Sequence, residues 1–271
     1  MKRQLLTLPL IAWLALSGCT GGGTTQSPPR VEDYAFGRED ARSLSVGVYL
    51  DYGVFGNCRN GTVTMLNEMR CPYELVTRDT IADGGLDRYR LLIMPGGDMY
   101  RYRTYLGDGG MAAIKSFVER GGGYIGVCGG SYFAAARTVW HGWAGKPREN
   151  IVFIGLGLWD AVAEGPIENF APGYVDEQCA VRLVDRRHPV THNLPETIPI
   201  HYDHGPAFLC NASVPADVLG TTVNGGKTIL AAFRCGAGRV FLTGVHPELS
   251  GSRISWVMMK NAIVWCSRTR P

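Results

Sequence analysis

Apolar runs and amphipathic stretches alternate through the first half of the chain. The apolar or alternating segments 43–50, 73–77 and 90–94 predict short strands, because each is bounded by Gly, Asn, Pro or Asp. Segments 62–69 and 111–120 carry apolar residues at helical spacing and predict helices. The run 90–94 is almost wholly apolar, as expected for a central strand buried on both faces. This alternation predicts a parallel sheet with helices on both sides.

The second half of the chain has a different pattern. Short strand candidates are separated by Gly, Asn and Pro turns, which predicts β-rich additions to the same sheet. A long apolar stretch over 252–266 predicts a final helix, whose Trp and Met residues we interpret as core. The strand candidates are 152–158, 180–184, 218–223, 228–233 and 239–245.

The N-terminus has the pattern of an export signal. Lys2 and Arg3 precede an apolar run over 5–16, which is too short to be a permanent membrane-spanning helix. The sequence Leu-Ser-Gly-Cys that ends at Cys19 resembles the lipobox of bacterial lipoproteins. We therefore expect residues 1–18 to be a lipoprotein signal peptide and Cys19 to carry lipid. The alternative is an ordinary secretory peptide in which Cys19 is incidental.

The rest of the chain divides into a tether and one large domain. Residues 20–29 are rich in Gly, Thr, Ser and Pro, a composition that suits a flexible linker, and we assign 19–42 to the lipidated cysteine and tether. Residues 43–268 are long enough for one domain with a sizeable core. The predicted location is the cell envelope, on the extracytoplasmic side, with the membrane reached through the lipid anchor. No oligomeric state follows from the sequence.

Charge and cysteine usage narrow the possible partners. Removal of residues 1–18 leaves 25 basic residues against 24 acidic ones, so nothing favours nucleic acid as a partner. In an exported protein, the six cysteines other than Cys19 and Cys128 could form three disulfides, with fifteen possible pairings. The pairs nearest in sequence are favoured: Cys58 with Cys71, and Cys210 with Cys235.

One cysteine lies where a strand turns sharply into a helix. Cys128 follows the apolar pair Tyr124-Ile125, is flanked by glycines, and precedes the helix-like segment 131–136. A side chain on such a turn is exposed above the sheet, next to the first N–H groups of the helix, which stabilise a thiolate. This pattern predicts a nucleophile, although a buried inert cysteine has the same local sequence.

A second motif ends the apolar run 239–245. His246 and Glu248 are two residues apart, so in an extended chain they lie on one face. Glu248 would then orient His246, and His246 would take a proton from Cys128. Read separately, a His-Pro pair is usually a turn; together the two motifs favour a catalytic site.

Other residues are candidates for substrate binding. Tyr52 and Asp98 follow predicted strands, and in open α/β sheets ligands bind beyond the carboxyl ends of the strands. Tyr202 belongs to a segment, 202–204, that we interpret either as a structural turn or as a wall of the Cys128 pocket. Segment 100–105 interleaves Tyr with Arg and is expected to be a solvated loop beside the pocket. We predict no metal site and no cofactor, since prolines interrupt the His-containing segments and no Cys-x-x-Cys spacing occurs.

These motifs resemble a known superfamily in their order and spacing. Pro-Gly-Gly-Asp at 95–98, the Cys128 elbow and His-Pro-Glu at 246–248 resemble the class I glutamine amidotransferase-like superfamily. Tyr-Phe after the elbow and Tyr-Asp-His-Gly-Pro-Ala-Phe at 202–208 are most similar to the biotin-protein ligase N-terminal domain family. The resemblance covers about residues 43–266.

The resemblance implies a fold and a chemistry. The implied fold class is α/β: a flavodoxin-like three-layer sandwich with a mostly parallel sheet. Cys128, His246 and Glu248 would be the catalytic residues, and backbone N–H groups near Gly97 and Gly129 would bind the oxyanion. We expect no biotin-ligase catalytic domain in this chain.

The sequence thus predicts a hydrolase that cleaves an amide-type carbon–nitrogen bond in a small-molecule or peptide-like substrate. The alternative is a ligand-binding lipoprotein that keeps the fold and performs no turnover.

Overall fold

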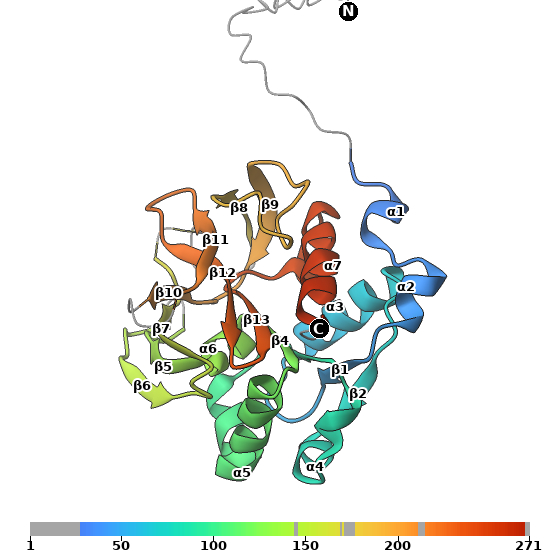
Figure 1. The fold of residues 1–271 in the computed structure, drawn as a ribbon. Coiled ribbons are helices and arrows are strands. Elements are labelled where there is room, and N and C mark those ends of the chain that lie inside the picture. The colour runs from blue at the N-terminus through green and yellow to red at the C-terminus, as the bar shows by residue number, and fades with distance from the viewer. Residues whose placement is uncertain (1–27, 144–145, 169, 171–176, 211–214, 269–271) are drawn as a thin grey trace, which may run out of the picture.

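A nine-stranded sheet runs through the computed structural model, which describes residues 28–143, 146–168, 170, 177–210 and 215–268 (Figure 1). Neighbouring strands are parallel from β2 to β13 and antiparallel from β13 to β9. The five parallel strands thus form one half of the sheet, and the later strands extend it. In order, the strands are β2 (Glu74–Val76), β1 (Val46–Tyr49), β3 (Leu91–Met94), β4 (Gly123–Val127), β13 (Gly238–Thr243), β12 (Thr228–Cys235), β11 (Asp217–Thr222), β8 (Glu177–Leu183) and β9 (Thr197–Tyr202).

Helices cover both faces of the parallel half (Figure 1). On β3, Leu91 and Ile93 face one core cluster while Leu92 and Met94 face the other, since side chains alternate along a strand. The first cluster is closed by α3 (Gly56–Glu68) and α7 (Ile254–Cys266), and the second by α4 (Arg78–Ala82) and α5 (Met99–Glu119). The prediction of a flavodoxin-like layered α/β fold is confirmed. A 3₁₀ turn (Gly85–Arg88) links α4 to β3.

A second sheet departs from the expectation that the β-rich additions extend the first one. Its strand order is β10 (Ala207–Cys210), β7 (Trp159–Gly165), β5 (Ala135–Trp140) and β6 (Ile151–Ile154). The Trp159 ring lies 5.0 Å from the Phe233 ring of β12, so this sheet packs on the face of the large sheet that also carries α5. Bulky aromatic side chains on both partners make this packing favourable.

Two helices begin earlier than predicted. Helix α3 starts at Gly56, and α5 starts at Met99, so the Tyr- and Arg-rich segment 100–105 is helical and not a loop. Tyr102 explains this difference, because its ring is fully buried and its hydroxyl donates to the Pro95 carbonyl at 3.1 Å. Gly107, at φ +63°, interrupts the regular geometry of α5.

Part of the expected flexible tether, residues 19–42, is helical. Residues 31–42 include α1 (Val31–Tyr34) and α2 (Arg38–Arg42). The Tyr34 ring packs edge-on against Trp256 of α7 at 5.5 Å, and apolar burial of this kind is what holds a short helix in place. The expected signal peptide and Cys19 lie outside the described residues.

The described part of the chain contains no helix that is long and apolar enough to cross a bilayer.

The predicted disulfides are wrong for this structure. Cys58 and Cys71 are both buried free thiols with different neighbours: Cys58 faces His246, and Cys71 lies 3.7 Å from the Pro72 carbonyl. Cys210 ends β10 in the small sheet, whereas Cys235 ends β12 in the large one, and both are free. Neither of the two favoured pairs is joined by a disulfide in this structure.

Candidate active site

Cys128 stands between β4 and α6 (Gly129–Ala134) in an unusual backbone conformation. Its φ is +47° and its ψ is −103°, a region that costs a non-glycine residue about 1–3 kcal/mol. Backbone hydrogen bonds hold it there: its N–H donates to the Thr243 carbonyl at 2.8 Å, and its carbonyl accepts from Ser131 and Tyr132 at 2.9 Å each. The predicted elbow is therefore present, with its strain supported by β13 and α6.

The glycines around the elbow allow backbone segments to touch. A Cβ on Gly129 would lie 2.1 Å from the Gly97 carbonyl oxygen, and one on Gly130 would lie 2.1 Å from that of Met94. Contacts this short exclude any side chain. The two residues expected to form an oxyanion hole, Gly97 and Gly129, are thereby brought against each other beside Cys128.

His246 and Glu248 follow β13, and the 3₁₀ turn Pro247–Leu249 aligns them. The Nδ1 atom of His246 lies 2.8 Å from Oε1 of Glu248, and both side chains are almost fully buried. The backbone N–H of His246 donates to the His201 carbonyl at 2.8 Å, which ties this turn to β9. The structure thus brings His246 and Glu248 together as predicted.

The environment of His246 favours its charged form. Burial taken by itself would lower the pKa of the imidazole, but the charges of Cys128 and Glu248 and hydrogen bonds from the two nearby cysteines raise the pKa well above its usual value. Nδ1 faces a carboxylate oxygen, and Nε2 lies 3.1 Å from the carbonyl oxygen of Asp203. Both ring nitrogens face acceptors, which suits an imidazolium.

The Asp203 carbonyl joins the two central residues of the site. It accepts the hydrogen bond from His246 Nε2 and lies 3.5 Å from the Cys128 sulfur. The Asp203 side chain pairs with His204 at 2.6 Å, and this hydrogen bond lowers the pKa of the Asp203 carboxyl. The neighbouring His204 has φ +55°, so the turn after β9 is held in a left-handed conformation at the edge of the site.

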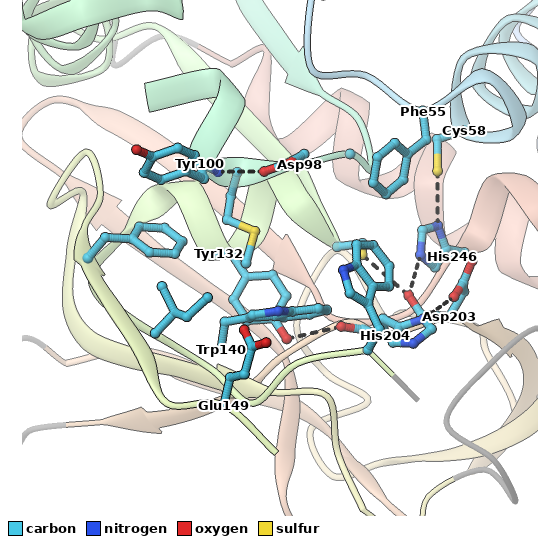
Figure 2. Close-up of a pocket in the computed structure, with 16 residues that line it drawn as sticks. Phe55, Cys58, Asp98, Tyr100, Tyr132, Trp140, Glu149, Asp203, His204 and His246 are labelled. Atoms are coloured by element: carbon cyan, nitrogen blue, oxygen red, sulfur yellow. Dashed lines mark hydrogen bonds and ion pairs between the residues drawn. The ribbon is translucent and has the colours of Figure 1, made fainter. Parts of the chain in front are cut away.

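Cys58 is a site residue that the sequence reasoning missed. It lies in the first turn of α3, is buried, and places its sulfur 3.9 Å from His246 Nδ1 (Figure 2). Burial raises the pKa of its thiol to about 11, against an opposing hydrogen bond from His246, so the thiol is neutral near pH 7. Its position just after the carboxyl end of β1 is the signal that points to the site, whereas the sequence reasoning assigns Cys58 to a disulfide.

A cavity of about 460 Å³ opens from Cys128. Gly97, Cys128 and His246 line it, and many of the other side chains around it are aromatic (Figure 2). The wall residues come from α3, α5, α6, the small sheet and the turn after β9. They are Phe55, Cys58, Asp98, Met99, Tyr100, Tyr132, Trp140, Trp143, Glu149, Ile151, Phe153, Asp203 and His204.

The three predicted substrate-binding residues have different positions. Asp98 lines the cavity, where it caps α5 by accepting from the N–H groups of Tyr100 and Arg101. Tyr52 lies in a neighbouring groove and not in the Cys128 cavity. Tyr202 is fully buried at the end of β9, with its hydroxyl bonded to the Ile167 N–H and the Gly205 carbonyl, so it does not reach the cavity. Asp203 and His204 of the same segment do line the cavity, so the segment 202–204 forms part of its wall.

The cavity residues between positions 140 and 153 could not be predicted from the sequence. Trp140, Trp143, Glu149 and Phe153 lie in or between β5 and β6, strands of the sheet that was not predicted. Their distance in sequence from Cys128 offers no spacing signal, since it is the packing of the small sheet that places them beside the elbow.

One cluster has donor atoms that suit a soft metal ion. Cys58, His246 and Glu248 offer a sulfur, a nitrogen and a carboxylate oxygen within 4.8 Å of one another, and the Oε2 atom of Glu248 has no hydrogen-bond partner among the described residues. Zinc accepts such a donor set. The same atoms serve equally well as an oriented base, and the Nδ1–Oε1 contact at 2.8 Å is a direct hydrogen bond.

Comparisons with known proteins identify the family and support the fold. The family model for the N-terminal region of biotin-protein ligase matches residues 44–264. The chain belongs to the biotin-protein ligase N-terminal family. A biotin–protein ligase of Schizosaccharomyces pombe is 29% identical over 169 residues, which cover 59% of this chain and 26% of the yeast protein. An uncharacterized protein of Chlamydia muridarum is 30% identical over 135 residues, covering 47% and 51%. The chain thus spans only a quarter to a half of these relatives.

Solved structures support the fold of this family member. A candidate ThuA-like protein from Bacteroides uniformis has a TM-score of 0.56 at 15% identity, covering 83% of this chain and 91% of its own. A candidate GMP synthase component from Thermoplasma acidophilum has a TM-score of 0.54 at 14% identity, covering 82% and 94%. At these identities the likeness concerns architecture, and it supports a glutamine amidotransferase-like fold.

Proposed function

We propose that this chain is an exported, lipid-anchored hydrolase that cleaves an amide-type carbon–nitrogen bond through an acyl-enzyme on Cys128. The observation that carries the proposal is the arrangement at the elbow: a strained cysteine, a buried imidazole oriented by a buried carboxylate, and one cavity that contains both Cys128 and His246. Nucleophile, base and orienting acid in this order are what cysteine-dependent acyl transfer requires.

The first half of the reaction uses each of these groups. Cys128 and His246 would react as a thiolate–imidazolium pair, in which Glu248 stabilises the imidazolium, and the thiolate attacks the amide carbon. Backbone N–H groups near Gly97 and Gly129 would stabilise the oxyanion that forms. His246 then gives its proton to the departing amine as the carbon–nitrogen bond breaks, and the acyl group remains as a thioester on Cys128.

Water completes the cycle. His246, now neutral, takes a proton from a water molecule, which attacks the thioester carbon; the carbon–sulfur bond breaks and the acid leaves. The substrate is thus an amide and the products are an acid and an amine. The proposed cellular location depends on residues 1–19. A short apolar signal that ends in a lipobox-like sequence would place the domain on the extracytoplasmic side of a membrane.

A second function is favoured by a specific contact. The carbonyl of Asp203 engages both Cys128 and His246, so the pair is satisfied internally without any substrate. A protein that uses the cavity to bind a ligand, and performs no turnover, is compatible with this arrangement.

Thiol labelling separates the two functions. Limiting iodoacetamide, followed by mass spectrometry, should label Cys128 fastest, and His246→Ala should slow its labelling at least about tenfold, because the partner that receives the thiol proton is gone. His192→Ala, at an exposed histidine outside the cavity, is the matched control and should leave the rate unchanged. A Cys128 that reacts no faster than exposed Cys210, with no effect of His246→Ala, would favour the binding protein.

Turnover provides the direct test. A panel of acyl p-nitroanilides should release nitroaniline in the native protein and not in Cys128→Ser, and a mass increase equal to the acyl group should be located on Cys128. Release that persists in Cys128→Ser would contradict the proposed mechanism.

A further inference from the structure

One wall of the cavity is a continuous group of aromatic rings. The Trp143 ring lies 5.1 Å from Trp140 and 5.0 Å from His204, and Trp140 lies 5.9 Å from Tyr132. Phe55 closes the group from the start of α3, with its ring 6.1 Å from Trp143. We call these five residues the aromatic wall. The Trp, Tyr and Phe rings of this wall offer electron-rich faces, which attract cations more strongly than neutral groups of the same shape.

The acidic and basic side chains that line the cavity are three carboxylates and the imidazoles of His204 and His246. Asp98, Glu149 and Asp203 line the cavity, and none of the described residues that line it is Lys or Arg. Two of these acids have cationic or imidazole partners: Asp98 lies 3.2 Å from Arg101, and Asp203 pairs with His204.

Glu149 is the carboxylate left to face a ligand. Its side chain is exposed and points into the cavity (Figure 2). The adjacent Arg148, which could have neutralised it, is paired instead with Glu168 at 2.7 Å. Among the described residues, the cavity therefore has aromatic faces and one carboxylate with no basic residue beside it on the wall.

We propose that the ligand of this cavity is an organic cation: an amide whose remote end carries an amine, substituted ammonium or guanidinium group. The cationic group packs on the aromatic wall beside Glu149, and the apolar body of the ligand fills the space between the wall and Ile151. Beside Glu149 and the Trp and Tyr rings, an anionic group would lose its hydration without gaining a Lys or Arg partner, so it is selected against at this end of the cavity.

This specificity also orients the substrate. The aromatic wall and Cys128 line the same cavity, so a cationic group anchored on the wall leaves the amide free to reach the sulfur. Binding energy from a part of the substrate that does not react can thus position the part that does. As a statement about a substrate the inference rests on the proposed hydrolase; as a statement about what binds, it holds for either function.

The test compares two probes of the same shape. Choline and its neutral isostere 3,3-dimethylbutan-1-ol are titrated into the native protein and into Cys128→Ala, with tryptophan fluorescence and calorimetry as readouts. Choline is expected to bind about tenfold more tightly than the neutral alcohol in both proteins, since only the cation gains from the rings and the carboxylate. Equal affinities would overturn the proposal.

Two variants locate the binding. Glu149→Gln should weaken choline severalfold and leave the alcohol unchanged, because it removes charge and keeps shape. Trp143→Leu should weaken both probes and choline more. Glu119→Gln is the matched control, since this exposed carboxylate ends α5, the helix that Asp98 caps at its other end. Choline binding that is insensitive to Glu149→Gln and Trp143→Leu would place the cation elsewhere and overturn the assignment.

The outcomes are distinguishable from those for catalysis. Selective choline binding together with an inert Cys128 would support the cation preference of the cavity and contradict the proposed hydrolase function. Rapid labelling of Cys128 without cation selectivity would do the reverse.

Discussion

His246 Nδ1 lies 2.8 Å from Glu248 Oε1, and the two side chains are only 2% and 1% exposed. A buried carboxylate is costly without a partner, and the imidazolium is that partner. The same contact fixes the ring so that Nε2 points to the Asp203 carbonyl, on the side where Cys128 lies. Glu248 therefore sets both the orientation and the charge of the His246 ring, and in the proposed reaction it would act as a positioning residue.

The first prediction concerns the charge of His246. Glu248→Gln removes a negative charge 2.8 Å from Nδ1, so the pKa of His246 should fall from its raised value toward the usual one near 6.5. Nuclear magnetic resonance titration of the ring Cε1–H proton measures it directly. An unchanged His246 titration would mean that Glu248 does not stabilise the imidazolium.

The same pairing makes a pH-dependent contribution to stability. Because the pKa of His246 is higher in the folded protein than in the unfolded one, its contribution is fully present below about pH 6.5 and is lost as pH rises through the folded pKa. Glu248→Gln should therefore lower the free energy of unfolding by about 1–3 kcal/mol at pH 6. The difference should narrow on raising the pH, and urea unfolding at several pH values tests it. A difference that widened with pH would contradict this assignment.

The second prediction concerns the backbone contact beneath the elbow. Gly129→Ala would place a methyl group 2.1 Å from the Gly97 carbonyl oxygen, so the loop before α5 and the elbow must move apart. We expect a loss of about 1–3 kcal/mol in the free energy of unfolding. Slower Cys128 labelling should accompany it.

Gly109→Ala is the control for that variant. Gly109 lies within α5 and has no atom within 4 Å of the added methyl group, so stability should stay the same or rise by about 0.5–1 kcal/mol. Denaturant unfolding compares the two. Equal stability of Gly129→Ala and Gly109→Ala would show that the approach of Gly97 to Gly129 is not required.

The parallel half of the fold could be predicted because its signals are local. The run ending at Met94 is apolar throughout, and the glycines beside Cys128 mark a turn that a side chain would obstruct. Likewise, His246 and Glu248 are close in sequence, so the spacing by itself suggested their contact. Each of these features depends on neighbours along the chain.

The small sheet could not be predicted because its reasons are long-range. The strand β5 follows α6 without a break, and its residues Ala135 and Ala136 continue the helical pattern. This segment is a strand because it pairs with Trp159–Gly165 and because the small sheet packs against the large one. Neither contact leaves a pattern in the local sequence. The aromatic wall depends on that sheet, so the specificity of the site was missed together with it.

The third prediction reverses our expectation about disulfides. Because Cys58, Cys71, Cys210, Cys235 and Cys266 are free thiols in the fold, alkylation in denaturant without reductant should modify all of them. A reductant should leave the melting temperature unchanged, since no covalent loop closure would be lost. The control is the same melt with Cys128→Ser, which removes any effect of the reactive thiol. A reductant-sensitive melt would restore a structural disulfide.

The fourth prediction concerns Cys19, which lies outside the described residues. The apolar run 5–16 followed by Leu-Ser-Gly-Cys predicts lipid attachment to this cysteine. Metabolic labelling with an alkynyl fatty acid should therefore mark the native protein and not Cys19→Ser. Cys210→Ser, which removes an exposed thiol on the folded domain, should keep the label.

The site gives the anchor a physical consequence. A single lipid-bearing cysteine followed by a Gly-, Thr- and Ser-rich stretch would hold the domain within reach of a membrane while leaving the cavity open. The anchored enzyme would then meet substrates near the surface, where an anionic headgroup layer concentrates organic cations. Cys19→Ser should leave the labelling rate of Cys128 in purified protein unchanged, because Cys19 precedes the predicted domain 43–268 that contains Cys128. Loss of fatty-acid label with unaltered Cys128 reactivity is the expected result; a fatty-acid label that persists in Cys19→Ser would refute the anchor.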